Sequence, residues 1–255
     1  MIFMLAGTSD ARELAIKIGE AGRKVIATVV TESAAKSLTE AGIQTNIGRL
    51  TAEQMAQFIQ EYKLQAIVDA SHPFAEEASK NALLAASQIG IPYIRYERAS
   101  QSYTNPLVTL VQDYEEAAAL AAKKRGVILL TTGSKTLGVF TKHLLGLENT
   151  RLIARMLPRL DNMEKCQTLG LEQKDIIAMQ GPFSKELNMA LIHQFEVTLM
   201  ITKESGKVGS VDEKLEAALA CGIETIMIAR PKVQYENIHS SFEDVIKDLS
   251  SKLGN

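Results

Sequence analysis

The sequence is poor in cysteine and has no long apolar run. Its 255 residues include only two cysteines, Cys166 and Cys221, and contain no Cys-x-x-Cys pair and no cluster of histidines. We therefore expect two reduced, unreactive thiols rather than a disulfide framework or a protein-bound metal. No stretch approaches the roughly 18–20 consecutive apolar residues that a transmembrane helix needs.

The sequence also lacks a large excess of either positive or negative charge. The 28 basic and 30 acidic side chains nearly cancel to a formal net charge of -2. Such a balance provides no overall field for nucleic acid or an anionic membrane, so we expect neither as a partner. Residues 1–7 lack a basic leader and are apolar over only about one strand length. We expect them to form a first β-strand rather than a signal peptide, and the protein to be cytoplasmic.

Short apolar segments alternate with longer amphipathic ones along most of the chain. In the first half, strands are expected at 2–5, 25–30, 44–47, 66–70 and 93–96, and helices at 9–21, 33–41, 51–61 and 75–89. Ala11, Leu14 and Ile18 recur at helical spacing and form one apolar stripe. Near-continuous apolar strands joined by helices are typical of a parallel sheet covered on both faces.

The alternation stops between Arg98 and Pro106, where a polar stretch ends in proline, and we place a domain boundary there. It then resumes, with strands near 107–111, 127–132, 151–155, 175–180, 197–202 and 225–229 and helices near 113–124, 135–145, 184–194 and 211–221. We predict an α/β protein with two Rossmann-like parallel-sheet domains, at 1–98 and 106–255, and a ligand cleft between them. A last helix, near 241–252, can pack back on either domain.

The first expected turn is AGTSDAR at residues 6–12. Gly7 lets the main chain approach a phosphate, and the following helix N-terminus offers unpaired N–H groups. Thr8 and Ser9 add hydroxyl groups. Only one glycine of the GxGxxG pattern is present, so a plain tight turn is the alternative to a phosphate site.

Glu32 and Ser33 follow the second expected strand. An acidic residue about 20–25 positions after the glycine usually binds the adenosine ribose and disfavours a 2′-phosphate. Glu32 therefore favours NADH, whereas Ser33 and Lys36 are suited to the phosphate of NADPH. A solvated glutamate at a helix start is the alternative, and the sequence leaves the choice of dinucleotide open.

The segment DASHPFA at residues 69–75 follows the fourth expected strand. Pro73 keeps the preceding main chain extended, so His72 is displayed at the carboxyl edge of the sheet. A structural histidine is the alternative. We expect Ser71 and His72 to lie in the site, with His72 contributing to binding rather than to proton transfer.

In the second half, glycine recurs with hydroxyl or basic side chains after three expected strands. These loops are 131–135, 179–184 and 202–206. Each combination suits an anionic group such as a carboxylate. Arg155 and Arg230 lie near two further strand ends. Several such loops on one sheet edge predict a cradle for a polyanionic ligand.

Taken in order, AGTSDAR, DASHPFA, TTGSK, RMLPR, MQGPFS and TKESG resemble segments of the precorrin-6A reductases of cobalamin biosynthesis. The resemblance extends from Ile2 to about Pro231, and DASHPFA, MQGPFS and TKESG are its most specific parts. Ala6 departs from the family, which commonly has a second glycine there.

The resemblance implies an oxidoreductase that transfers a hydride from NADPH or NADH to precorrin-6A, or to its cobalt complex, giving the dihydro 6B form. The substrate would be a tetrapyrrole, and the sequence does not indicate an oligomeric state. The residues assigned to the cofactor are Gly7, Thr8, Ser9, Glu32, Ser33, Ser71 and His72. Those assigned to the substrate, from the loops and the resemblance together, are Thr132, Gly133, Ser134, Lys135, Arg155, Gln180, Gly181, Ser184, Lys203, Ser205 and Gly206. His72 and Lys203 are the candidate proton donors.

Two other functions are alternatives to this one. A different nicotinamide-dependent oxidoreductase of the short-chain type would need a Tyr-x-x-x-Lys pair, which none of the six tyrosines provides. A non-catalytic, two-lobed protein that closes on a small anion is the second. No paired carboxylates, Ser-His-Asp set or metal-ligand cluster suggests hydrolysis or metal catalysis.

Overall fold

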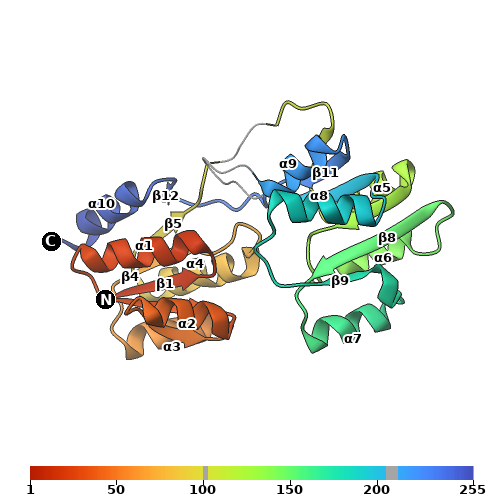
Figure 1. Ribbon diagram of the computed structural model, residues 1–255. Coiled ribbons are helices and arrows are strands. Elements are labelled where there is room, and N and C mark those ends of the chain that lie inside the picture. The colour runs from red at the N-terminus through yellow and green to blue at the C-terminus, as the bar shows by residue number, and fades with distance from the viewer. Residues whose placement is uncertain (100–102, 205–211, 255) are drawn as a thin grey trace. The chain divides into compact units, whose positions relative to one another are not determined.

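The chain forms two compact units in the computed structural model, which describes residues 1–99, 103–204 and 212–254 (Figure 1). The first unit combines Met1–Ala99 with Lys232–Asn255, and the second is Ser100–Pro231. Each unit holds one six-stranded sheet. All strand pairings are parallel. The α/β prediction with two Rossmann-like parallel sheets is thereby confirmed.

The first unit follows the expected alternation almost residue for residue. Its elements are β1 (Ile2–Ala6), α1 (Ser9–Glu20), β2 (Val25–Val29), α2 (Glu32–Glu40), β3 (Gln44–Ile47), α3 (Ala52–Glu61), β4 (Ala66–Ala70), α4 (Glu76–Ile89) and β5 (Tyr93–Tyr96), joined by β12 (Ile238–His239) and α10 (Phe242–Leu253). The strand order is β12-β5-β4-β1-β2-β3. The chain therefore leaves β1 towards one edge and returns at β4 on its other side, which makes the β1–β4 gap the switch point of the sheet.

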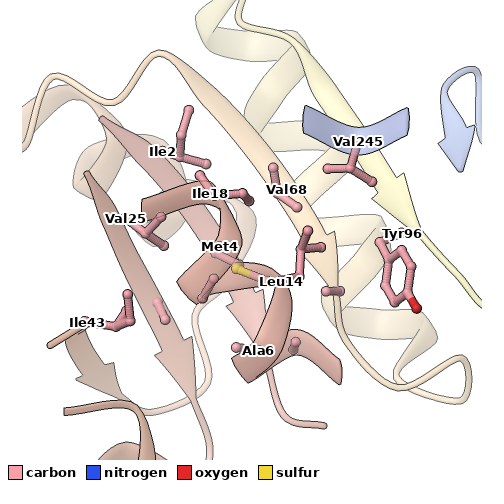
Figure 2. Packing of buried hydrophobic residues seen from close by; sticks show 14 of the residues in the cluster. Ile2, Met4, Ala6, Leu14, Ile18, Val25, Ile43, Val68, Tyr96 and Val245 are labelled. Atoms are coloured by element: carbon pink, nitrogen blue, oxygen red, sulfur yellow. The ribbon is translucent and has the colours of Figure 1, made fainter. Parts of the chain in front are cut away.

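Helices cover both faces of this sheet. On one face, Leu14 and Ile18 of α1 pack with Ile2 and Met4 of β1 in one buried cluster (Figure 2). On the other face, the alternate strand residues pack with α3 and α4. This two-sided burial explains why the central strands are predominantly apolar and do not alternate apolar with polar residues.

The last helix belongs to the first unit, although the sequence assigned residues 106–255 to the second domain. Val245 of α10 is buried in the same cluster as α1 (Figure 2). Leu249 of α10 is buried in that cluster as well. β12 pairs with β5, placing Ile238 opposite Arg95. The apolar stripe of α10 predicts a buried face but does not identify the sheet that buries it, so the sequence left this helix open to either domain. In the structure the second unit ends at Pro231 rather than at residue 255.

The second unit is also built around a switch point. Its elements are β6 (Val108–Val111), α5 (Tyr114–Lys124), β7 (Gly126–Leu130), α6 (Leu137–Leu144), β8 (Thr150–Met156), α7 (Leu160–Thr168), η1 (Gln173–Asp175), β9 (Ile176–Ala178), α8 (Lys185–Gln194), β10 (Leu199–Lys203), α9 (Glu213–Ala220) and β11 (Glu224–Ile228). The strand order is β6-β11-β10-β7-β8-β9. The connections run to opposite sides of β7, so the switch point lies between β7 and β10.

Helix α7 was not predicted. Its buried residues are Asn162 and Cys166, whereas Leu160 is 76% exposed. Its N-cap residue is Arg159, whose side chain does not cap the helix. A helix that buries an amide and a thiol in place of an aliphatic stripe carries no periodic apolar signal.

Candidate functional site

The turn after β1 lies at the switch point of the first sheet. The last register partners of β1 and β4 are Ala6 and Ala70. Gly7 and Ser71 come next along each strand, so the turn before α1 and the loop before α4 leave the sheet side by side. Open parallel sheets bind ligands at this position, outside the carboxyl ends of the strands.

Gly7, Thr8 and Ser9 connect β1 to the N-terminus of α1. Gly7 is exposed, and a Cβ added to it would meet no atom within 4 Å beyond its adjoining residues. Thr8 is the N-cap, and its hydroxyl accepts the main-chain N–H of Ala11 at 3.1 Å. Ser9 is exposed. The open space beside Gly7 and the positive end of α1 fit a phosphate group.

The loop after β4 carries Ser71 and His72. The main-chain N–H of Ser71 donates to Asp69 Oδ1 at 2.9 Å. His72 is exposed, and its Nδ1 accepts the main-chain N–H of Phe74 at 3.2 Å. A neutral His72 ring therefore carries its proton on Nε2. Both residues lie at the sheet edge that also holds Gly7.

Glu32 and Ser33 form the first turn of α2, directly after β2. Thr31 caps this helix by accepting the main-chain N–H of Ala34 at 3.3 Å. Glu32 and Ser33 are both exposed. An acidic side chain after the second strand occupies the position at which Rossmann-type sheets bind the adenosine ribose. The candidate cofactor residues thus all follow β1, β2 or β4.

The loop after β7 lies beside the end of β10. The main-chain N–H and the hydroxyl of Thr131 each donate to the carbonyl of Ile201 at 3.0 Å. Thr132 is buried, with its hydroxyl 3.3 Å from that of Thr136. These bonds fix the start of the loop at the switch point of the second sheet.

Helix α7 braces the rest of this loop. Gly133 has a left-handed φ of 80°, which glycine adopts without a steric penalty. Ser134 donates its hydroxyl to Asn162 Oδ1 at 2.5 Å, and Lys165 Nζ donates to the carbonyl of Lys135 at 3.1 Å. The Lys135 side chain is exposed. The loop main chain is therefore fixed while an ammonium group is presented at the surface.

Lys203 ends β10 and lies near two other lysines. Burial, together with the charges of Lys135 and Lys214, lowers the pKa of Lys203 to about 8. Its Nζ lies 5.5 Å from the centroid of the Tyr114 ring. Three ammonium groups therefore lie within electrostatic range of one another near the end of β10, an arrangement that suits a ligand with several carboxylates.

Arg155, near the end of β8, is a buried cation. Its Nη1 donates to Asn188 Oδ1 at 2.7 Å, and its guanidinium lies 3.9 Å from the centroid of the Phe183 ring. Burial lowers the pKa of Arg155 to about 10, and Asp212 opposes that shift. No acidic group within residues 103–204 and 212–231 forms a salt bridge with this guanidinium.

The loop after β9 carries Gln180, Gly181 and Ser184. Gln180 is exposed, and the peptide bond between Gly181 and Pro182 is cis. Ser184 is the N-cap of α8, and its hydroxyl accepts the main-chain N–H of Leu187 at 3.2 Å. Ser184 therefore has a structural task that the sequence did not indicate. The candidate residues Ser205 and Gly206 lie outside the described residues.

Sequence reasoning missed several neighbours of these side chains. Phe183 and Asn188 hold the Arg155 guanidinium, and Lys214 shifts the pKa of Lys203. Asn188 and Lys214 lie on helices whose polar positions carry no functional pattern. Phe183 belongs to the MQGPFS segment, but nothing in that segment indicates that its ring contacts an arginine.

In the part of the chain that the structure describes, no three His, Cys, Asp or Glu side chains are grouped as a metal-ion site. Among the described helices, none has the length and apolarity required to cross a bilayer.

Comparison with known proteins identifies relatives along almost the whole chain. The profile of the family described as precorrin-6x reductase CbiJ/CobK matches residues 1–250. The cobalt-precorrin-6A reductase of Priestia megaterium is 63% identical, over 98% of this chain and 98% of its own length. That of Salmonella typhimurium is 36% identical, over 90% and 87%. A solved structure described as CobK precorrin-6A reductase superposes with a TM-score of 0.80 at 23% identity, over 100% and 98% of the two chains, and supports the fold.

Proposed function

The chain belongs to the precorrin-6x reductase CbiJ/CobK family, and we propose that it reduces a double bond of cobalt-precorrin-6A in cobalamin biosynthesis, with a nicotinamide dinucleotide as reductant. The observation that carries this proposal is the clustering of the candidate residues. In each unit most of them lie at the carboxyl ends of the strands that flank the switch point of the sheet, or of the strands next to those; Gln180, Gly181 and Ser184 follow the edge strand β9. The 63% identity to the cobalt-precorrin-6A reductase of Priestia megaterium supports the cobalt-loaded substrate over the metal-free one.

The first unit is proposed to bind the dinucleotide. The main chain at Gly7 and the N-terminus of α1 would hold the pyrophosphate, with Thr8 and Ser9 as hydroxyl donors. Glu32 would bind the adenosine ribose and disfavour a 2′-phosphate, so we propose NADH as the preferred cofactor. Ser33 would adjoin the ribose, and Ser71 and His72 would line the site from the neighbouring strand end.

The second unit is proposed to bind the tetrapyrrole. Arg155, Lys135 and Lys203 would pair with its carboxylates, and Arg155 is already desolvated. Hydroxyl, amide and main-chain groups of the adjoining loops would complete the contacts; they are Thr132, Gly133, Ser134, Gln180, Gly181 and Ser184, with Ser205 and Gly206 proposed from the sequence alone. Distributing the positive groups over the carboxyl ends of several strands suits a wide ligand whose carboxylates are far apart.

Reduction of the double bond requires a hydride at one carbon and a proton at the next. The bound nicotinamide supplies the hydride. Lys203 is the first candidate for the proton donor, because its pKa of about 8 leaves the ammonium acidic enough to donate near neutral pH. His72 is the second candidate, through its Nε2.

The decisive experiment incubates the purified protein with NADH or NADPH and with cobalt-loaded or metal-free precorrin-6A. We expect loss of the reduced-nicotinamide absorbance and formation of the dihydro product, identified by mass spectrometry, most rapidly with NADH and the cobalt complex. Dinucleotide binding without turnover of either macrocycle would refute the reductase. Tight anion binding without any dinucleotide binding would instead support the two-lobed binding protein.

A further inference from the structure

A buried ion pair lies beside the loop that carries Ser71. Asp69 of β4 and Arg95 of β5 are register partners, and both side chains are fully buried. Arg95 Nη1 lies 2.8 Å from Asp69 Oδ1. Buried ion pairs seldom stabilise a fold more than apolar residues of the same volume, because both charges lose their hydration. The pair therefore calls for an explanation other than stability.

Both ends of the pair bind Ser71. Asp69 Oδ1 accepts the main-chain N–H of Ser71 at 2.9 Å, and Arg95 Nη1 donates to Ser71 Oγ at 3.2 Å. Ser71 Oγ also lies 3.4 Å from Ser79 Oγ of α4. The main chain and the side chain of Ser71 are thus fixed by one rigid, buried unit.

The remaining hydrogen-bonding groups of the pair are satisfied by neighbours. Tyr93 donates its hydroxyl to Asp69 Oδ2 at 2.7 Å. Arg95 donates from Nε and Nη2 to Glu97 Oε2, at 3.0 and 2.9 Å. Burial and the Asp69 carboxylate raise the pKa of Tyr93, so its hydroxyl remains a donor at all ordinary pH values. A satisfied buried network of this kind allows one geometry only.

The returning segment after the second unit covers this network. The ring of Tyr235 stacks on that of Tyr93, with centroids 6.2 Å apart and planes within 9°. The Arg95 guanidinium lies 5.3 Å from the Tyr235 centroid. Asn237 accepts the main-chain N–H of Arg95 at 2.8 Å through its carbonyl. The network therefore depends on residues far apart in the chain.

We propose that Asp69 and Arg95 are positioning residues. They hold Ser71, beside Gly7, in the conformation that binds the dinucleotide. This inference rests on the proposed function of the first unit. A loop that is already ordered loses less conformational entropy when the ligand binds, so the fixed Ser71 loop lowers the Kd of the dinucleotide. Neither side chain needs to touch the dinucleotide.

The test measures the Kd of NADH by nicotinamide fluorescence for the wild type, Arg95→Met, Ser71→Ala and the double variant. We expect Arg95→Met to raise Kd about tenfold, the effect of one lost hydrogen bond to a charged group. Because Arg95 acts through Ser71, the two effects should not add: the Kd of the double variant should be no higher than that of the single variant with the higher Kd. Arg95→Lys should recover part of the affinity. The control Arg151→Met removes the ion pair to Asp175 in the second unit and should leave the Kd unchanged.

Arg95→Met leaves Asp69 buried without its partner, so folding is checked by circular dichroism. If that variant does not fold, Arg95→Lys replaces it in the cycle with Ser71→Ala. Unchanged Kd values, or effects of Arg95 and Ser71 substitutions that simply add, would overturn the inference while leaving the proposed function intact. A wild-type protein that binds neither NADH nor NADPH would overturn both.

Discussion

The guanidinium of Arg155 lies over the face of Phe183, with 3.9 Å between its central carbon and the ring centroid. An aromatic face and the Asn188 amide hold this cation without neutralising it. With a pKa of about 10, Arg155 remains charged at neutral pH despite its burial. A cation that is already desolvated has less hydration left to lose when an anionic ligand binds, so its attraction to a carboxylate is stronger than that of an exposed arginine.

Replacing this cation should therefore affect the substrate selectively. We expect Arg155→Met to raise the KM for cobalt-precorrin-6A at least about tenfold and to leave the Kd of NADH unchanged. Methionine fills a similar volume and removes a buried charge, so the melting temperature should shift by only about 2–4 °C. The exposed Arg159 of the next loop provides the control, and Arg159→Met should have no effect on KM. An unchanged KM for Arg155→Met would remove this residue from the substrate site.

A second prediction concerns Gly7. In Gly7→Val the new Cβ meets no atom within 4 Å beyond the adjoining residues, and the main chain is outside the left-handed region, so folding should be preserved. It would occupy the space proposed for the pyrophosphate, and we expect the Kd of NADH to rise at least about tenfold. Fluorescence titration measures this change, and the thermal melting curve serves as the control. Wild-type affinity in Gly7→Val would place the pyrophosphate elsewhere.

The strand-end loops were predictable from the sequence because they are marked by local chemistry. Glycine with hydroxyl residues follows the apolar strands β1, β7 and β9 at their carboxyl ends, which points to Gly7, Gly133 and Gly181 without tertiary information. Strand order was not predictable in the same way. The juxtaposition of Ala6 with Ala70 depends on pairing between strands that are separated by two intervening strand–helix units.

The supporting side chains were hidden for a different reason. Arg95 lies within Tyr93–Tyr96, where it is fully buried in a strand predicted from its apolar residues. Its partner Asp69 was visible in the DASHPFA segment, but the pairing appears only once β4 and β5 lie in register. Local pattern thus predicts the strand-end loops that we propose as ligand contacts and misses the polar groups beneath them, which depend on tertiary contacts.

A third prediction follows from the low pKa of Lys203. Only the protonated amine attracts carboxylates or donates a proton, so kcat/KM for the macrocycle should fall as the pH rises through about 8. Lys214→Gln removes a nearby positive charge, raises the pKa of Lys203 and should move the fall to higher pH. Steady-state rates across this pH range measure both effects. In Lys203→Met the fall should vanish, and its persistence there would assign the titration to another group.

The last prediction concerns cofactor choice. Glu32 is exposed at the first turn of α2, where its carboxylate would repel the 2′-phosphate of NADPH. Glu32→Gln keeps the size of the side chain and removes the charge, so the ratio of kcat/KM for NADPH to that for NADH should rise severalfold. Because the effect is electrostatic and exposed to solvent, it should shrink as the salt concentration increases. Glu40→Gln, at the opposite end of the same helix, removes an equal charge and should leave the ratio unchanged. An equal change of this ratio in both variants would show that net charge alone sets the cofactor preference. An unchanged ratio in Glu32→Gln would show that Glu32 does not lie beside the adenosine ribose.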